Sequence, residues 1–213
     1  MGKGLNRVNF TRARLAGATA KSNGSQFEEL IDHACIRYKA LKLAYIEKTP
    51  EPMKPLGRPD AYGHFSAVYT KAAQPDYKGT LKGGRSIVFE AKHTNSMRIE
   101  KIRVNEEQAA SLSRHQQLGA ICFVLVSFRF ENYYVVPWDI WKNMEEHFYK
   151  KSVNESDLLP YLVPGIMQFL KNPLTQNIIT NVSRGTATVK SNEAAPTTKK
   201  VKDWPSYLDY PLK

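Results

Sequence analysis

The segment from Pro75 to Lys92 holds the side chains that could do chemistry. It reads P-D-Y-K-G-T-L-K-G-G-R-S-I-V-F-E-A-K, with Asp76 near its start and Glu90 and Lys92 after the apolar run Ile87–Phe89. Successive side chains of a β-strand point to opposite faces, so Glu90 and Lys92 share one face of the strand that this run predicts. Two carboxylates beside an ammonium can hold Mg2+ and activate a water molecule against a phosphate.

Glycines between the two acids predict the turn that brings them together. Gly79, Gly83 and Gly84 read as a hairpin turn that folds the second strand back beside Asp76. An E-x-K pattern alone is weak, because charged side chains at strand ends are usually solvated. The prediction therefore rests on the aspartate, the turn and the E-x-K pattern together.

The composition favours a polyanionic partner. The chain has 213 residues, 42% of them hydrophobic, and a formal net charge of +11. Nucleic acid is the first candidate partner and an anionic membrane surface the second. No apolar run approaches the roughly 20 residues of a membrane span, and the start lacks the apolar core of a signal peptide. Cys35 and Cys122 lie in apolar segments, as free buried thiols of a cytoplasmic protein do.

Three regions are expected along the chain. Residues 1–23 carry only basic charges and read as a disordered basic arm, either a solvated tail or a contact for DNA phosphates. Residues 24–145 form the core. Residues 146–213 form a C-terminal extension, with a mobile linker at about 183–203.

A helix is predicted from Ser25 to about Leu43. Ser25 can cap it, with Glu28 completing a capping box. An apolar face recurs at helical spacing, formed by Phe27, Ile31, Ala34, Tyr38 and Leu41. Glu28 thus has two interpretations, a cap or a carboxylate of the active site.

Further elements follow on both sides of the E-x-K strand. Residues 44–48 predict a short strand, and residues 105–118 a helix capped by Asn105. The almost wholly apolar stretch 120–128 is typical of a central strand covered on both faces. Residues 132–137 predict its neighbour, and a helix begins at Trp138.

These motifs resemble the PD-(D/E)XK nuclease superfamily, and within it the RecU-type Holliday junction resolvases of Gram-positive bacteria and their phages. The resemblance rests on the Asp76 and E-A-K arrangement, on G-S-Q-F-E-E-L-I from Gly24, A-Y-I-E-K-T-P-E-P from Ala44, Gln108, and G-A-I-C-F-V-L from Gly119. It covers about residues 22–140 and returns faintly at Tyr207. It implies an α/β fold with a restriction-endonuclease-like core, a central mixed sheet flanked by helices.

The resemblance also implies a stalk at residues 53–70 that enters the junction centre. This segment is rich in proline and glycine yet holds large side chains such as Tyr62 and Phe65. The alternative is a long loop packed on its own protein.

The function implied is a Mg2+-dependent endonuclease, with Mn2+ as a substitute, that resolves four-way DNA junctions by symmetric paired nicks in recombination and repair. Asp76, Glu90 and Glu28 would bind the metal, Lys92 would orient the attacking water, and Gln108 would position the nucleophile. His93 is expected to be structural or to face the substrate. The expected DNA contacts are Lys48, Lys71, Lys78, Arg98, Lys101, Arg103, Tyr62 and Phe65.

A homodimer is implied because two symmetric nicks need two sites, and a recombinase is a further candidate partner. The setting would be the cytoplasm of a bacterium or a phage-infected host. Two alternatives stay open: another nuclease of the superfamily, of restriction or end-processing type, and a DNA-binding module without catalysis.

Overall fold

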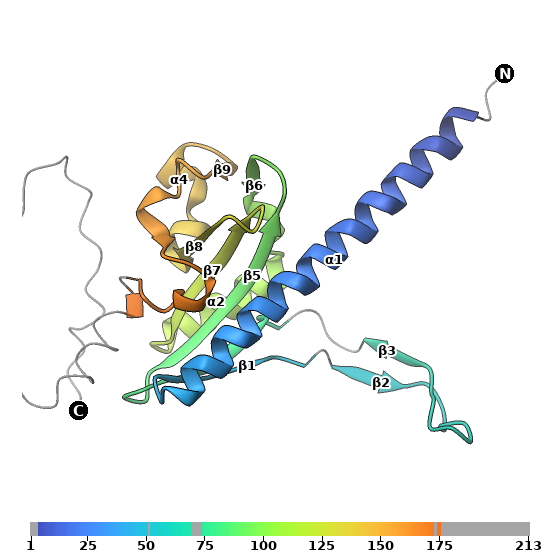
Figure 1. Cartoon of the computed structure of the whole chain (residues 1–213), viewed down its shortest axis with the longest axis horizontal. Coiled ribbons are helices and arrows are strands. Elements are labelled where there is room, and N and C mark those ends of the chain that lie inside the picture. Colours follow the sequence, from blue (N-terminus) through green and yellow to red (C-terminus); the bar gives the residue numbers. More distant parts are fainter. Residues whose placement is uncertain (1–3, 51, 70–73, 173, 176–213) are drawn as a thin grey trace, which may run out of the picture.

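A six-stranded mixed sheet forms the centre of the molecule (Figure 1). The structure is a computed structural model and describes residues 4–50, 52–69, 74–172 and 174–175. Neighbouring strands of this sheet are antiparallel except β5 and β7, which run parallel. In spatial order the strands are β1 (Ala44–Lys48), β4 (Tyr77–Leu81), β5 (Ser86–Thr94), β7 (Ile121–Phe128), β8 (Asn132–Pro137) and β10 (Leu162–Val163).

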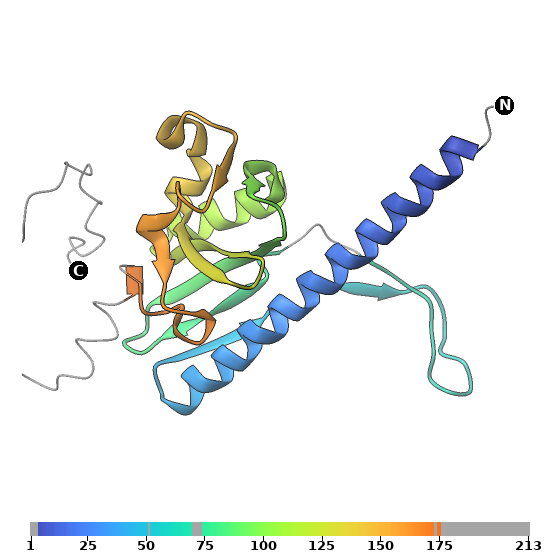
Figure 2. The same cartoon turned by 45° about the horizontal axis from the view of Figure 1, so that its top comes forward.

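Helices cover the sheet on both faces (Figures 1 and 2). Helix α1 (Gly4–Ala40) packs on one face, while α2 (Glu106–Gln117) and α3 (Trp138–Lys142) pack on the other. All eight residues of β7 are therefore buried, as predicted for a central strand. The remaining helical elements are α4 (Met144–Phe148) and the short 3-10 turns η1 (Lys101–Arg103), η2 (Leu159–Tyr161) and η3 (Ile166–Gln168). None of the described helices is long and apolar enough to cross a membrane.

Helix α1 begins much earlier than predicted. It starts at Gly4 rather than at Ser25, so the expectation of a disordered arm is wrong for residues 4–23. No proline interrupts this stretch, and alanine, arginine, lysine and leucine within it all favour a helix. Ser25 lies inside the helix and does not cap it, so the capping interpretation of Glu28 is wrong as well.

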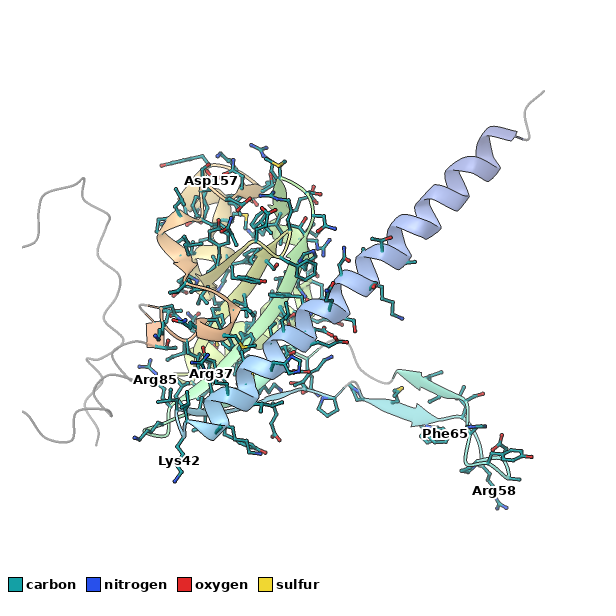
Figure 3. The ribbon with its side chains drawn as sticks, in the orientation of Figure 1. Arg37, Lys42, Arg58, Phe65, Arg85 and Asp157 are labelled. Atoms are coloured by element: carbon teal, nitrogen blue, oxygen red, sulfur yellow. The ribbon has the colours of Figure 1, made fainter. Side chains whose placement is uncertain are left out.

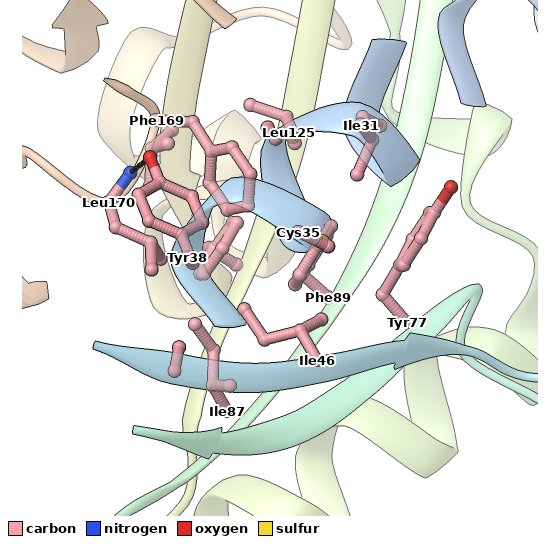
Figure 4. Close-up of a cluster of buried hydrophobic side chains, with 14 of the residues drawn as sticks. Ile31, Cys35, Tyr38, Ile46, Tyr77, Ile87, Phe89, Leu125, Phe169 and Leu170 are labelled. Atoms are coloured by element: carbon pink, nitrogen blue, oxygen red, sulfur yellow. Dashed lines mark hydrogen bonds between the residues drawn. The ribbon is translucent and has the colours of Figure 1, made fainter. Parts of the chain in front are cut away.

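The core face of α1 is formed by four of the five predicted residues. Phe27, Ile31, Ala34 and Tyr38 are buried, whereas Leu41 follows the end of the helix and is 54% exposed. Figure 4 shows Ile31 and Tyr38 of this face against the sheet. On the sheet, the ring of Phe89 stacks on Tyr77 at 4.9 Å and on Phe123 at 4.7 Å between centroids.

The C-terminal extension contributes to the same core, and Leu174 is the last described hydrophobic residue packed against it. The hydroxyl of Tyr38 accepts a hydrogen bond from the backbone N–H of Leu170 at 3.1 Å (Figure 4). It also donates one to the carbonyl of Met167 at 3.2 Å. Strand β10 closes the sheet edge, and β9 (Ser152–Asn154) pairs with β6 (Arg98–Glu100) in a second small sheet. The linker expected at 183–203 and the motif at Tyr207 lie outside the described residues.

Residues 53–69 form a projecting ribbon rather than a loop packed on the core. Strands β2 (Met53–Pro55) and β3 (Ala67–Tyr69) pair antiparallel and lead away from the sheet. Figure 3 places Arg58 and Phe65 in its outer part. Tyr62 is 86% exposed and Phe65 52%. We call this segment the stalk.

The hairpin between β4 and β5 forms as predicted, with one correction. Gly83 and Gly84 take the turn with φ of +96° and +89°. Gly79 instead lies within β4, opposite Ile46 of β1. A Cβ atom at Gly79 would lie 2.6 Å from the Cα of Ile46 and would also collide with the carbonyl oxygen of Tyr45. The missing side chain therefore lets β1 approach β4.

Gly79→Ala is expected to lower the free energy of unfolding by about 1–3 kcal/mol, because backbone atoms must move to admit the methyl group. Gly24→Ala is the matched control, since nothing lies within 4 Å of its added Cβ and the site is helical; it should be neutral or slightly stabilising. Chemical denaturation of both variants measures the difference. Equal stabilities would show that β1 does not depend on the close approach.

Candidate active site

The β4–β5 register places Asp76 beside the E-A-K triplet. Tyr77 pairs with Phe89, so Asp76, which immediately precedes β4, reaches the next part of β5. Its Oδ2 accepts a hydrogen bond from the backbone N–H of Ala91 at 2.8 Å. The ammonium of Lys92 lies 2.8 Å from Oε2 of Glu90 and 3.7 Å from Oδ2 of Asp76. One lysine thus joins two carboxylates from adjacent strands.

Gln108 reaches this cluster from the first turn of α2. Asn105 and Gln108 form a capping box, in which the Asn105 side chain accepts from the backbone N–H of Gln108 at 2.9 Å. The side-chain oxygen of Gln108 accepts from the Asn105 N–H at 3.2 Å, which leaves its amide nitrogen to donate to Oε2 of Glu90 at 2.7 Å. The cap therefore holds Gln108 against Glu90.

Glu90 is fully buried, and only one of its two carboxylate oxygens has hydrogen-bond partners. Its Oε2 receives Lys92 and Gln108, whereas its Oε1 is buried without a hydrogen-bond partner. Burial raises the pKa of Glu90 to about 9; Lys92 lowers the pKa, and the nearby Asp76 carboxylate raises it again. An ionised oxygen without a partner is costly at this depth, and a proton, a water molecule or a cation at Oε1 would relieve that cost.

These residues fit a divalent metal ion. The pair Asp76 and Glu90 offers hard carboxylate oxygens, the donors that Mg2+ prefers, and Oε1 of Glu90 has no other partner. Asp76 is partly open to solvent, with 22% of its side chain exposed, so an ion could reach the pair.

Glu28 stands in a separate ion pair. Its Oε2 lies 2.8 Å from the ammonium of Lys48. Lys48 is the last residue of β1 and pairs with Tyr77 of β4. Within the described part of the chain, no three His, Cys, Asp or Glu side chains are grouped closely enough to hold a metal. The metal-ligand role expected for Glu28 stays a prediction.

Asp32 and Tyr77 also lie near the site, and the sequence patterns did not indicate either of them. The hydroxyl of Tyr77 lies 2.9 Å from Oδ1 of Asp32 and 3.1 Å from the carbonyl oxygen of Glu28. Asp32 lies four residues after Glu28, hence on the same side of α1. The i, i+4 spacing of Glu28 and Asp32 could have indicated from the sequence that Asp32 also lies near the site.

His93 is part of the packing. It is buried, its ring nitrogens lie 3.1 Å from Oγ of Ser127 and 2.9 Å from Oδ1 of Asn95, and its ring stacks on Phe130 at 4.0 Å between centroids. Burial lowers the pKa of His93. The structural interpretation of His93 accounts for all these contacts.

The expected DNA contacts lie in different surroundings, and their role stays a prediction. Lys78 donates to the side chain of Gln74 at 2.9 Å, and Lys101 lies 3.5 Å from Glu145. Arg103 donates to the carbonyl of His93 at 3.2 Å, which ties it to β5. Tyr62 and Phe65 lie on the stalk, Arg98 is exposed on β6, and Lys71 lies outside the described residues.

Comparison with known proteins decides the family. The family model of RecU, recombination protein U, matches residues 22–173. The chain belongs to the RecU family. It is 27% identical over 158 residues to the Holliday junction resolvase RecU of Bacillus pumilus (strain SAFR-032), a match that covers 70% of this chain and 76% of the relative.

The solved structure of Archaeoglobus fulgidus Hjc, a Holliday junction resolvase from an archaeal hyperthermophile, also resembles this RecU-family chain. The likeness has a TM-score of 0.42 at 14% identity and covers 65% of this chain and 94% of Hjc. The mixed sheet flanked by helices agrees with the fold class predicted from the sequence.

The buried acid should make the stability of the metal-free protein fall with rising pH. The pKa of Glu90 is raised from about 4.5 to about 9, so between these values the folded chain holds a proton that the unfolded chain releases. The loss is at most about 1.4 kcal/mol per pH unit. Glu90→Gln carries no titrating group and should remove this fall.

Thermal melts in EDTA from pH 6 to pH 9 compare the two proteins. The wild type should lose more melting temperature over this range than Glu90→Gln. Parallel curves would show that Glu90 is ionised in the metal-free protein.

Proposed function

We propose that this chain is a metal-dependent endonuclease that resolves four-way DNA junctions by paired symmetric nicks. The observation that carries the proposal is the Asp76, Glu90 and Lys92 cluster, with its buried free carboxylate oxygen, in a member of the RecU family. The Bacillus pumilus relative bears the name of Holliday junction resolvase.

Asp76 and Glu90 would hold the ion, with Mg2+ as the metal and Mn2+ as a substitute. Mg2+ keeps several of its waters and needs few protein carboxylates, so two or three ligands suffice. Glu28 would complete the set, directly or through water. When bound, the metal supplies an activated water and offsets negative charge on the phosphate.

Lys92 and Gln108 would govern the geometry around Glu90. The ammonium of Lys92 touches Glu90 and lies close to Asp76, with 14% of its side chain exposed, so it can meet the attacking water and the phosphate oxygens at the mouth of the site. Gln108 donates to Oε2 of Glu90 from the α2 side, which would leave Oε1 available to the ion.

Substrate selection would come from parts outside this cluster. A homodimer would present two such sites to the two strands that are cut. The stalk would enter the junction centre with Tyr62 and Phe65, whose exposed rings can stack on unpaired bases. Basic side chains around the site would bind phosphates, with an affinity that falls as salt rises.

Asp76→Asn, Glu90→Gln and Lys92→Ala are each expected to abolish junction cleavage in Mg2+ while junction binding survives, because affinity comes from many other basic contacts. Lys82→Ala, in the exposed β4–β5 turn, is the control and should cleave normally. Cleavage gels and binding titrations on four-way, nicked and linear DNA give the comparison. Loss of binding together with cleavage in all three folded variants would overturn the assignment. Equal cleavage of linear duplex would favour a restriction-type nuclease.

The double variant Tyr62→Ala with Phe65→Ala is expected to weaken binding to junctions by roughly tenfold or more, as base–aromatic stacks contribute about 1–3 kcal/mol each. Binding to linear duplex should be unaffected. Tyr149→Ala removes another aromatic residue, 91% exposed, and serves as the control. An unchanged preference for junctions in the double variant would exclude the stalk from substrate selection.

A further inference from the structure

We infer that Lys48 competes with the metal for Glu28, so that the metal site is completed only when DNA phosphate takes Lys48 away. The inference rests on the proposed function and assigns to Lys48 a positioning role beyond phosphate binding. It makes metal loading depend on the presence of substrate.

Lys48 and Glu28 form an ion pair that is partly exposed to solvent. Lys48 and Glu28 are 2.8 Å apart, with 47% and 30% of their side chains exposed. The hydrogen bond to Glu28 is the main cause that raises the pKa of Lys48, and Asp32 and Asp76 add to it. Lys48 therefore remains an ammonium and acts as a resident cation among the acids of α1 and β4.

The place of Lys48 at the end of β1 puts its backbone next to that of the expected metal ligand Asp76. It is the last residue of β1 and lies opposite Tyr77, whose chain neighbour is Asp76. The backbone N–H of Thr49 donates to the carbonyl of Asp76 at 2.8 Å, which fixes the end of β1 to the start of β4. The backbones that carry Lys48 and Asp76 are thus held together, and the ammonium of Lys48 binds Glu28.

The Glu28 carboxylate can change partners without moving its helix. The Tyr77 hydroxyl donates to the backbone carbonyl of Glu28 and not to its side chain. This hydrogen bond therefore does not restrict rotation of the Glu28 carboxylate. Ion pairs of this exposure contribute little to stability and are weakened by competing ions. A phosphate that binds Lys48 therefore releases Glu28 at small cost, and the released carboxylate can join Asp76 and Glu90.

When Lys48 passes from Glu28 to a phosphate and Glu28 passes to the metal, each charged group keeps a partner of opposite charge. Without substrate, Lys48 offsets Glu28, and Lys92 lies between the other two carboxylates. With substrate, the phosphate takes the ammonium and Glu28 turns to the metal. Metal and DNA should consequently strengthen each other's binding by the same factor, because linkage is reciprocal.

A double-mutant cycle with Lys48→Met and Glu28→Gln tests the competition in the absence of DNA. The probe is Mn2+, titrated into the full-length protein with free Mn2+ read by electron paramagnetic resonance. Lys48→Met should bind Mn2+ about two- to fivefold tighter than wild type, the size expected for a half-exposed pair. In the Glu28→Gln background the same substitution should have no effect. Lys82→Met controls for the loss of one positive charge elsewhere and should match wild type.

A second readout measures the linkage. Junction affinity is compared with and without Ca2+, which binds carboxylates in looser geometry and is expected to support binding without efficient cutting. Ca2+ should strengthen junction binding more in wild type than in Lys48→Met. Thermal melts establish that each variant is folded.

Unchanged or weaker Mn2+ binding by Lys48→Met would overturn the inference, as would a gain that persists when Glu28 is replaced. If wild type cleaves junctions under these conditions, the proposed function stands even though the competition fails. If wild type neither binds Mn2+ nor cleaves, the proposed function fails first.

Discussion

The structure depends on a buried carboxylate in the middle of a central strand. An ionised carboxylate at such a position is costly unless it is paired and hydrogen-bonded. Glu90 meets half of this requirement through Lys92 and Gln108, and its second oxygen is left without a partner. An apolar residue of similar size would avoid this cost, so we interpret the retained carboxylate as a functional feature.

The surrounding elements place the groups that hold Glu90. Strand β4 brings Asp76, and the capping box of α2 holds Gln108 against Glu90, so the cap that begins a helix also orients a side chain of the site. The close approach of β1 at Gly79 holds the strand that carries Lys48 next to β4, and α1 supplies its partner Glu28. The β4–β5 turn, the cap of α2 and the strand register together place these groups around the carboxylate of Glu90.

Much of this arrangement could be predicted from local sequence patterns. Alternation along β5 placed Glu90 and Lys92 on one face, and the apolar run of β7 indicated a strand covered on both sides. The length of α1 could not be predicted in this way, since the basic composition of residues 4–23 is typical both of disorder and of an exposed helix. Asp32 was missed because its role depends on Tyr77, which is distant in sequence and meets it only through packing. The contribution of residues 152–172 likewise rests on long-range contacts, such as that of Tyr38 with Leu170.

We propose that Asp76 and Glu90 together hold the metal ion of a nuclease. Anomalous X-ray scattering from crystals soaked in Mn2+ tests it most directly, because it locates the ion without relying on activity. We expect a peak in contact with Oε1 of Glu90 and with the carboxylate of Asp76, and no peak there in Glu90→Gln. An ion bound elsewhere, or an empty pair at Mn2+ concentrations that support cleavage, would contradict it.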